Sequence, residues 1–168
     1  ANPEVAKGQM AYMKNHFEFY GLKTPIRREL QQPFLVKQYL PPKPELEDII
    51  KILWEKPQRE FQYFGQELFF KYKRQFDQKD IILLEHIITS KSWWDTIDFI
   101  ASNLVGHYFK LFPDQRWPIC EKWLLGDNIW LHRSALLFQL KYKTEVDIEL
   151  LKHIIYRLLG SNEFFINK

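Results

Sequence analysis

The chain has 168 residues and a small positive charge, with 24 lysines and arginines against 21 aspartates and glutamates. Its content of 46% hydrophobic and 27% charged residues is typical of one soluble globular domain, and its charge permits a polyanionic partner without requiring one. No apolar run approaches the roughly 18 residues of a membrane span, the N-terminus lacks the apolar core of a signal peptide, and Cys120, the single cysteine, excludes an internal disulfide. We therefore expect a cytoplasmic protein with no membrane contact.

Helical periodicity is the dominant pattern along the chain. Apolar residues recur at the i, i+3, i+4 spacing of helices in residues 45–54, 59–73, 79–89, 93–112 and 146–159. Glycine is scarce at six, and most of the nine prolines fall where these helices should start or stop. Because no stretch shows sustained strand alternation between hairpin turns, the sequence predicts an all-α fold.

The predicted helices form a repeat with a period of about 35 residues. The longer helix of each repeat opens near Arg59, Ser92, Asn128 or Asn162. Each follows a shorter helix, which opens near Glu45, Gln78, Gln115 or Asp147. Such paired helices predict an α-solenoid of HEAT-like antiparallel helix pairs, forming a single domain over residues 1–168.

Basic residues recur where three of the longer helices end, in residues 69–74 (FFKYKR), 107–110 (HYFK) and 138–143 (FQLKYK). If these helices line a concave wall, the cations form a basic groove suited to DNA; they are Lys71, Lys73, Arg74, Lys110, Lys141 and Lys143. The alternative needs no ligand, because a cation near a helix C-terminus complements the helix dipole. The interleaved Tyr72 and Tyr142 fit either nucleic-acid stacking or plain packing.

Several kinds of chemistry have no sequence support. The chain contains no phosphate-binding loop, dinucleotide fingerprint or CxxC pair. Its five histidines form no metal-binding motif, so we expect neither a metal nor a cofactor; they are His16, His86, His107, His132 and His153. Covalent acyl transfer has no candidate nucleophile in the sequence, because Cys120 is the single cysteine and no serine lies in a nucleophile-elbow motif.

The stretch SWWDTID, residues 92–98, places an aromatic wall beside an anion. Trp94 and Asp98 are four residues apart and share one face of the predicted helix. An indole face attracts a cation at roughly 0.5 to 2 kcal/mol, and a carboxylate stabilises an oxocarbenium-like sugar. Together they suit an N-glycosidic bond whose leaving base is already positively charged, because such a base departs neutral and needs no general acid.

Arg133 is a charged residue on the apolar stripe of its predicted helix, four residues from both Ile129 and Leu137. Asp98 lies in the equivalent helix of the preceding repeat, so stacked repeats would bring Asp98 and Arg133 to one surface. There Arg133 could hold a phosphate. The alternative is a structural ion pair between repeats.

The sequence resembles the AlkD-type DNA alkylation repair proteins, which are HEAT-like-repeat DNA glycosylases. The resemblance rests on four stretches: SWWDTID (92–98), NIWLHRSALLFQLKYK (128–143), NEFFINK (162–168) and AYMKNHFEFYGLKTPIRR (11–28). The similarity runs from near residue 8 to the end. It implies base excision repair of N3- and N7-alkylated purines, which are cationic lesions, in duplex DNA bound by a monomer. In that family further helices follow, so we expect the family's C-terminal helices to be missing after residue 168.

The resemblance also assigns roles to residues. It implies that Asp98 is the catalytic carboxylate, that Trp94 is a wall against the lesion, and that Arg133 contacts the DNA backbone. Positions near the DNA are matched by Tyr12, Phe164 and Phe165. The competing interpretation is a non-catalytic helical-repeat module that binds DNA or a protein partner through the same face.

Overall fold

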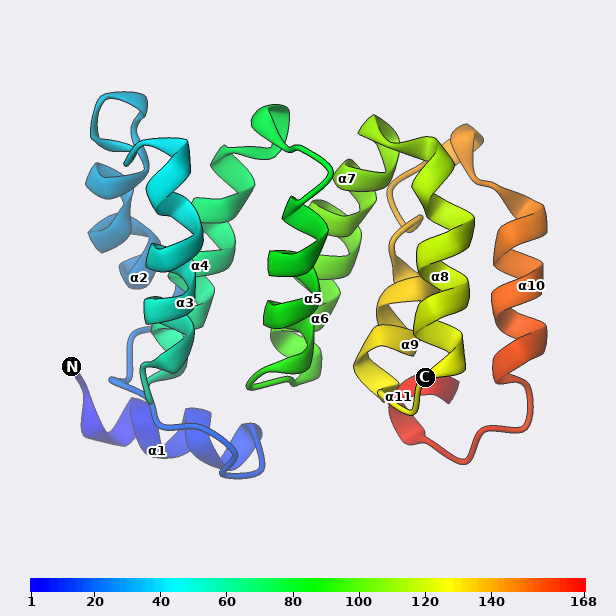
Figure 1. Ribbon diagram of the computed structural model, residues 1–168. Coiled ribbons are helices and arrows are strands. Elements are labelled where there is room, and N and C mark those ends of the chain that lie inside the picture. The colour runs from blue at the N-terminus through cyan, green and yellow to red at the C-terminus, as the bar shows by residue number, and fades with distance from the viewer. The chain divides into compact units, whose positions relative to one another are not determined.

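The computed structural model describes residues 1–168, and every regular element in it is a helix (Figure 1). The predicted all-α fold class is confirmed. Chain contacts define two compact units, Ala1–Tyr72 and Lys73–Lys168. No helix is both long and apolar enough to traverse a lipid bilayer.

The first unit contains four α-helices: α1 (Pro3–Tyr12), α2 (Thr24–Gln31), α3 (Leu46–Glu55) and α4 (Arg59–Lys71). Short 3-10 helices lie between α2 and α3, at Gln32–Leu35, Lys37–Tyr39 and Lys43–Glu45. The core of this unit is the packing of α3 on α4. The buried face of α3 consists of Leu46, Ile50 and Trp54, which are spaced by one helical turn.

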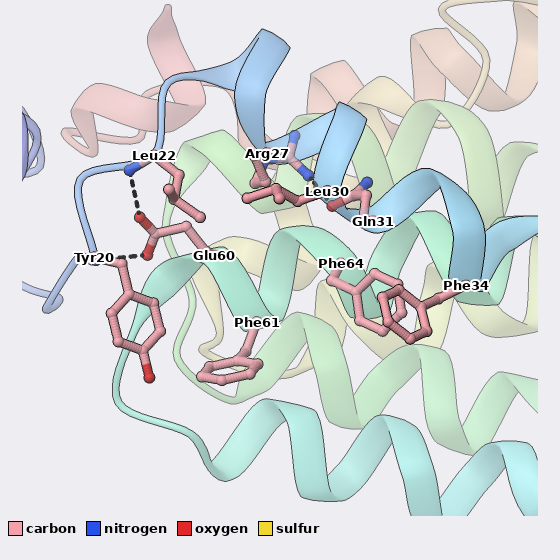
Figure 2. Close-up of a pocket in the computed structure, with 9 residues that line it drawn as sticks. All are labelled: Tyr20, Leu22, Arg27, Leu30, Gln31, Phe34, Glu60, Phe61 and Phe64. Atoms are coloured by element: carbon pink, nitrogen blue, oxygen red, sulfur yellow. Dashed lines mark hydrogen bonds between the residues drawn. The ribbon is translucent and has the colours of Figure 1, made fainter. Parts of the chain in front are cut away.

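The segment before α2 is fixed to α4 through Glu60. The Glu60 carboxylate accepts hydrogen bonds from the backbone N–H groups of Tyr20 (3.1 Å), Gly21 (3.1 Å) and Leu22 (3.2 Å), two of which appear in Figure 2. Gly21 has φ +83°, and a Cβ there would lie 2.0 Å from the carbonyl oxygen of Asn2. Only glycine fits this turn, which therefore allows three backbone donors to surround one buried carboxylate.

The second unit contains the remaining α-helices: α5 (Asp80–Thr89), α6 (Trp94–Phe99), α7 (Gly106–Leu111), α8 (Arg116–Leu125), α9 (Ile129–Leu137), α10 (Ile148–Leu158) and α11 (Phe164–Asn167). A π-helical segment, Ile100–Val105, joins α6 to α7. Three short 3-10 helices lie at Lys73–Gln75, Pro113–Gln115 and Lys143–Glu145. Within this unit α9 packs against α5, α6, α8 and α10, so it is the central helix.

The predicted helix starts are confirmed to within about two residues. The α4 helix begins at Arg59, and α6 begins at Trp94, two residues after Ser92. The α9 helix follows Asn128, whose side-chain oxygen accepts hydrogen bonds from the backbone N–H groups of Trp130 (3.0 Å) and Leu131 (3.2 Å). Asp147 caps α10 in the same way. The solenoid stacking and the concave basic groove remain predictions.

Three buried tyrosines make similar contacts: Tyr72 is the C-cap of α4, Tyr108 lies within α7, and Tyr142 follows α9. Tyr72, Tyr108 and Tyr142 are between 1% and 3% exposed. Each hydroxyl donates a hydrogen bond to a backbone carbonyl 30 to 36 residues earlier in the chain; the acceptors are Pro41, Gln78 and Gly106, respectively. Burial raises the pKa of all three phenols, that of Tyr142 to about 12, so they remain neutral donors. These tyrosines pack in the interior, and the stacking alternative for Tyr72 and Tyr142 was wrong.

Candidate functional site

The centre of the candidate site is an ion pair between α6 and α9. Arg133 Nε donates to Asp98 Oδ1 at 2.7 Å, and Arg133 Nη2 donates to Asp98 Oδ2 at 3.0 Å. Such a two-point contact fixes the plane of the carboxylate as well as its position. The Arg133 side chain is 12% exposed and that of Asp98 is 41% exposed. The arginine is thus the buried partner, and the carboxylate keeps an open side.

The backbone around Asp98 departs from a regular helix. Directly after α6 the chain takes a π-helical turn, in which Ser102 Oγ donates to the Asp98 carbonyl at 2.7 Å. Segments of this kind are frequent at functional sites. Gly106 ends the segment, and a Cβ there would lie 2.5 Å from the carbonyl oxygen of Phe138. The absent side chain therefore permits the close approach of the chain at the end of α9.

Arg133 has a third anchor that the sequence did not indicate. Its Nη1 donates to the backbone carbonyl of Phe165 in α11. The Phe165 ring packs against Trp93 at 5.0 Å and against Trp130 at 5.1 Å between ring centroids. The two tryptophan rings lie 5.7 Å apart, so the three rings contact one another. We call Trp93, Trp130 and Phe165 the aromatic cluster.

The second tryptophan of SWWDTID is Trp94. It is the first residue of α6 and is half-buried. Asp98 follows one helical turn later, so the two side chains leave the helix on the same face, as the sequence predicted. Trp93 therefore packs on Trp130 and Phe165, and Trp94 shares the helix face of Asp98.

Three of the cations predicted to bind DNA influence His107. Burial lowers the pKa of His107, and the positive charges of Lys73, Lys110 and Arg74 lower it further. The Nε2 atom of His107 is buried and has no hydrogen-bond partner. Three of the predicted cations therefore act electrostatically on one partly buried imidazole.

The other predicted DNA contacts occupy several environments. Lys110 forms an ion pair with Glu145, and Lys141 Nζ donates to Asn103 Oδ1 at 2.6 Å. All the residues in the remaining group are exposed; they are Tyr12 (68%) and Lys71 in the first unit and Lys143 and Phe164 (63%) in the second. Phe165 is half-buried in the aromatic cluster. The sequence predicted neither this cluster nor its two tryptophans, although Trp130 lies on the same apolar stripe as Arg133.

A separate pocket of about 320 Å³ lies in the first unit (Figure 2). Its walls are mainly apolar, with Leu30, Phe34, Phe61 and Phe64 among the lining residues. Three of its polar residues already have partners: backbone N–H groups surround the Glu60 carboxylate, and the lining arginine and glutamine bond one another and Glu67. These three side chains are therefore engaged in structural contacts.

The structure likewise assembles neither a reactive thiol nor a metal site. Cys120 is buried, and burial raises the pKa of its thiol to about 12, so it stays protonated and is a poor nucleophile. No three side chains among histidine, cysteine, aspartate and glutamate converge as a metal site would require.

Comparison with known proteins identifies a family and similar solved structures. A family model described as DNA alkylation repair enzyme matches residues 1–168. Among solved structures, the chain is similar to one described as a predicted DNA alkylation repair enzyme from Enterococcus faecalis, with 30% identity and a TM-score of 0.89. That match covers 98% of this chain and 77% of the other. No curated protein matches. Because the family match spans all 168 residues, it includes the Asp98 site.

Proposed function

Because the chain belongs to the DNA alkylation repair enzyme family, we propose that it is a DNA glycosylase that excises positively charged N3- or N7-alkylated purines from duplex DNA. The observation that carries this proposal is the open carboxylate of Asp98, held at two points by Arg133. A purely structural ion pair has no need for the carboxylate to be the more exposed partner. A carboxylate that faces a polyanion is useful where it stabilises positive charge that develops in the transition state.

The proposed reaction is hydrolysis of the bond between C1′ of the sugar and N9 of the alkylated purine. The bond breaks with its electron pair moving to the base, which neutralises the positive charge and lets the base leave without a general acid. Asp98 stabilises the oxocarbenium-like sugar and orients a water molecule. The water oxygen then bonds to C1′, and its proton passes to Asp98 or to solvent. Trp94, on the same helix face, supplies a wall that attracts the cationic base.

Arg133 has two roles in this proposal. A guanidinium carries five N–H donors, of which three are used by Asp98 and Phe165, so two remain for a DNA phosphate near the lesion. Its main role is to hold the carboxylate, because its side chain is 12% exposed. The remaining proposed DNA contacts are Tyr12, Phe164, Lys71, Lys73, Arg74, Lys110, Lys141 and Lys143.

A second candidate function is non-catalytic binding of DNA or a protein partner. The extensive anchoring of Arg133 favours it, because a buried arginine with three hydrogen bonds also suits a structural pair. Salt dependence separates DNA from a protein partner. Duplex binding through the listed cations should weaken with salt at a log-log slope of about −0.9 per phosphate neutralised.

The direct test is release of 7-methylguanine or 3-methyladenine from alkylated duplex DNA. The chain should release at least one of these bases and leave an abasic site, and heat-denatured protein should release neither above the spontaneous rate. Binding of the alkylated duplex with no release by the native protein would favour the non-catalytic function. The assay also compares the two lesions, whose order of preference the site geometry leaves open.

A further inference from the structure

The orientation of Arg133 depends on more than Asp98. Its Nε and Nη2 face the carboxylate, and its Nη1 faces the carbonyl of Phe165. The guanidinium is planar, so fixing the third nitrogen fixes the plane in which the other two donate. The Phe165 carbonyl therefore restricts how Arg133 presents its fork to Asp98.

The Phe165 carbonyl has little local support of its own. The α11 helix has only four residues, Phe164–Asn167, which is too short for a stable helix by itself. The segment is held instead by contacts outside its own turn: Asn167 Nδ2 donates to the carbonyl of Ser161 at 2.6 Å, and the Phe165 ring lies about 5 Å from Trp93 and from Trp130. Because Trp93 directly precedes α6 and Trp130 lies in α9, the ring bridges the two helices that carry Asp98 and Arg133.

We propose that Phe165 is a positioning residue: its ring, packed between Trp93 and Trp130, holds the carbonyl that orients Arg133 toward the Asp98 carboxylate. The catalytic consequence rests on the glycosylase function proposed above. The structural part concerns the protein without DNA. This role differs from the direct DNA contact expected for Phe165 from the sequence. The neighbouring Phe164 is 63% exposed and is better placed for such a contact.

The test uses Phe165→Ala, which removes the ring and keeps the backbone carbonyl. Phe165→Tyr restores a ring of the same shape. The matched control is Phe112→Ala, which removes a ring packed at 4.9 Å on Tyr108 in the same unit but has no contact with Arg133. The first readout is hydrogen exchange of the Arg133 Nε–H by NMR in the DNA-free protein, with the signal assigned by its loss in Arg133→Lys.

In Phe165→Ala the Nε–H exchange should accelerate by about tenfold, as expected when a hydrogen bond to a charged group loses its fixed geometry. Phe165→Tyr should restore slow exchange, and Phe112→Ala should leave it unchanged. The second readout is single-turnover excision of 7-methylguanine at saturating DNA. The rate should fall in Phe165→Ala while the Kd for duplex DNA stays the same.

Unchanged Nε–H exchange in Phe165→Ala would overturn the proposal, whatever the effect on excision. So would weaker DNA binding with a parental rate at saturation, which identifies a DNA contact. If the parental protein excises nothing, the proposed glycosylase function fails. The exchange measurement then still decides the positioning role, because it needs no activity.

Discussion

The two units each contain an arginine held by a carboxylate, yet the pairs differ in exposure. In the first unit Arg27 and Glu67 are 9% and 16% exposed, and Gln31 bonds both side chains, so the network is closed. In the second unit Arg133 is 12% exposed, and Asp98 is 41% exposed. The chemistry of the two pairs is the same. What distinguishes a structural network from a candidate site is the open side of the carboxylate.

The largest expected effect is on stability in the closed pair. Glu67→Gln removes the negative charge and leaves Arg27 buried without its anion. It should lower the free energy of unfolding by about 3 kcal/mol, the lower end of the range for an orphaned buried charge. Urea unfolding followed by circular dichroism measures the change. The control is Glu149→Gln, because Glu149 is 77% exposed and pairs with Lys152 on the surface. A Glu67→Gln loss no larger than the control's would show that the closed network is not a stabilising element.

The next largest effect concerns Gly106, which lies close to the end of α9 and so supports the open pair, Asp98 and Arg133. A methyl group at Gly106 would lie 2.5 Å from a backbone carbonyl, which cannot move aside as a flexible side chain could. Gly106→Ala should therefore cost about 1 to 3 kcal/mol of stability by overpacking. It should also slow excision, because it displaces α9, which carries Arg133. Gly8 in α1 is the control: it has nothing within 4 Å, so Gly8→Ala should be neutral or stabilising. Equal melting temperatures for the two variants would contradict the close approach.

The smallest expected effect is a pH dependence confined to the second unit. The pKa of His107 is lowered from 6.5 in the folded protein by burial and then by Lys73, Lys110 and Arg74. The unfolded chain therefore binds a proton in the pH range just below 6.5 where the folded chain does not, and stability falls as the pH drops through that range. His107→Gln should flatten this part of the curve of melting temperature against pH from 7 to 5. An unchanged curve would show that His107 titrates alike in both states.

The sequence predicted those features that depend on periodicity. Helices were expected to open near Asn128 and Asp147, and α9 and α10 begin directly after these residues. The pairing of Asp98 with Arg133 was also predictable, because their separation of 35 residues equals one repeat and places them at equivalent helix positions. The repeat period, and not local helix propensity, thus predicted that Asp98 and Arg133 meet.

The sequence could not predict contacts made by backbone atoms or by ring packing. The i, i+4 spacing placed Trp94 on the face of Asp98, but nothing in the pattern indicates that Trp93 packs on Phe165. The π-helical segment after Asp98 changes the register of the following residues, and a 3.6-residue period does not reveal it. The burial of Tyr72 and Tyr142 was equally hidden, because a tyrosine beside lysines fits a core and a surface alike.

The most direct test of the account is Asp98→Asn, the counterpart in the open pair of Glu67→Gln in the closed one. The change keeps the shape and removes the charge that stabilises the sugar cation. Single-turnover excision of 7-methylguanine should fall by about 100- to 1,000-fold, while stability falls less than in Glu67→Gln, because water reaches the open side of this pair, and DNA affinity holds or rises. Melting temperature and duplex Kd are recorded for the same preparation. An Asp98→Asn protein that folds normally and excises at the parental rate would contradict the account and leave the pair as a structural contact.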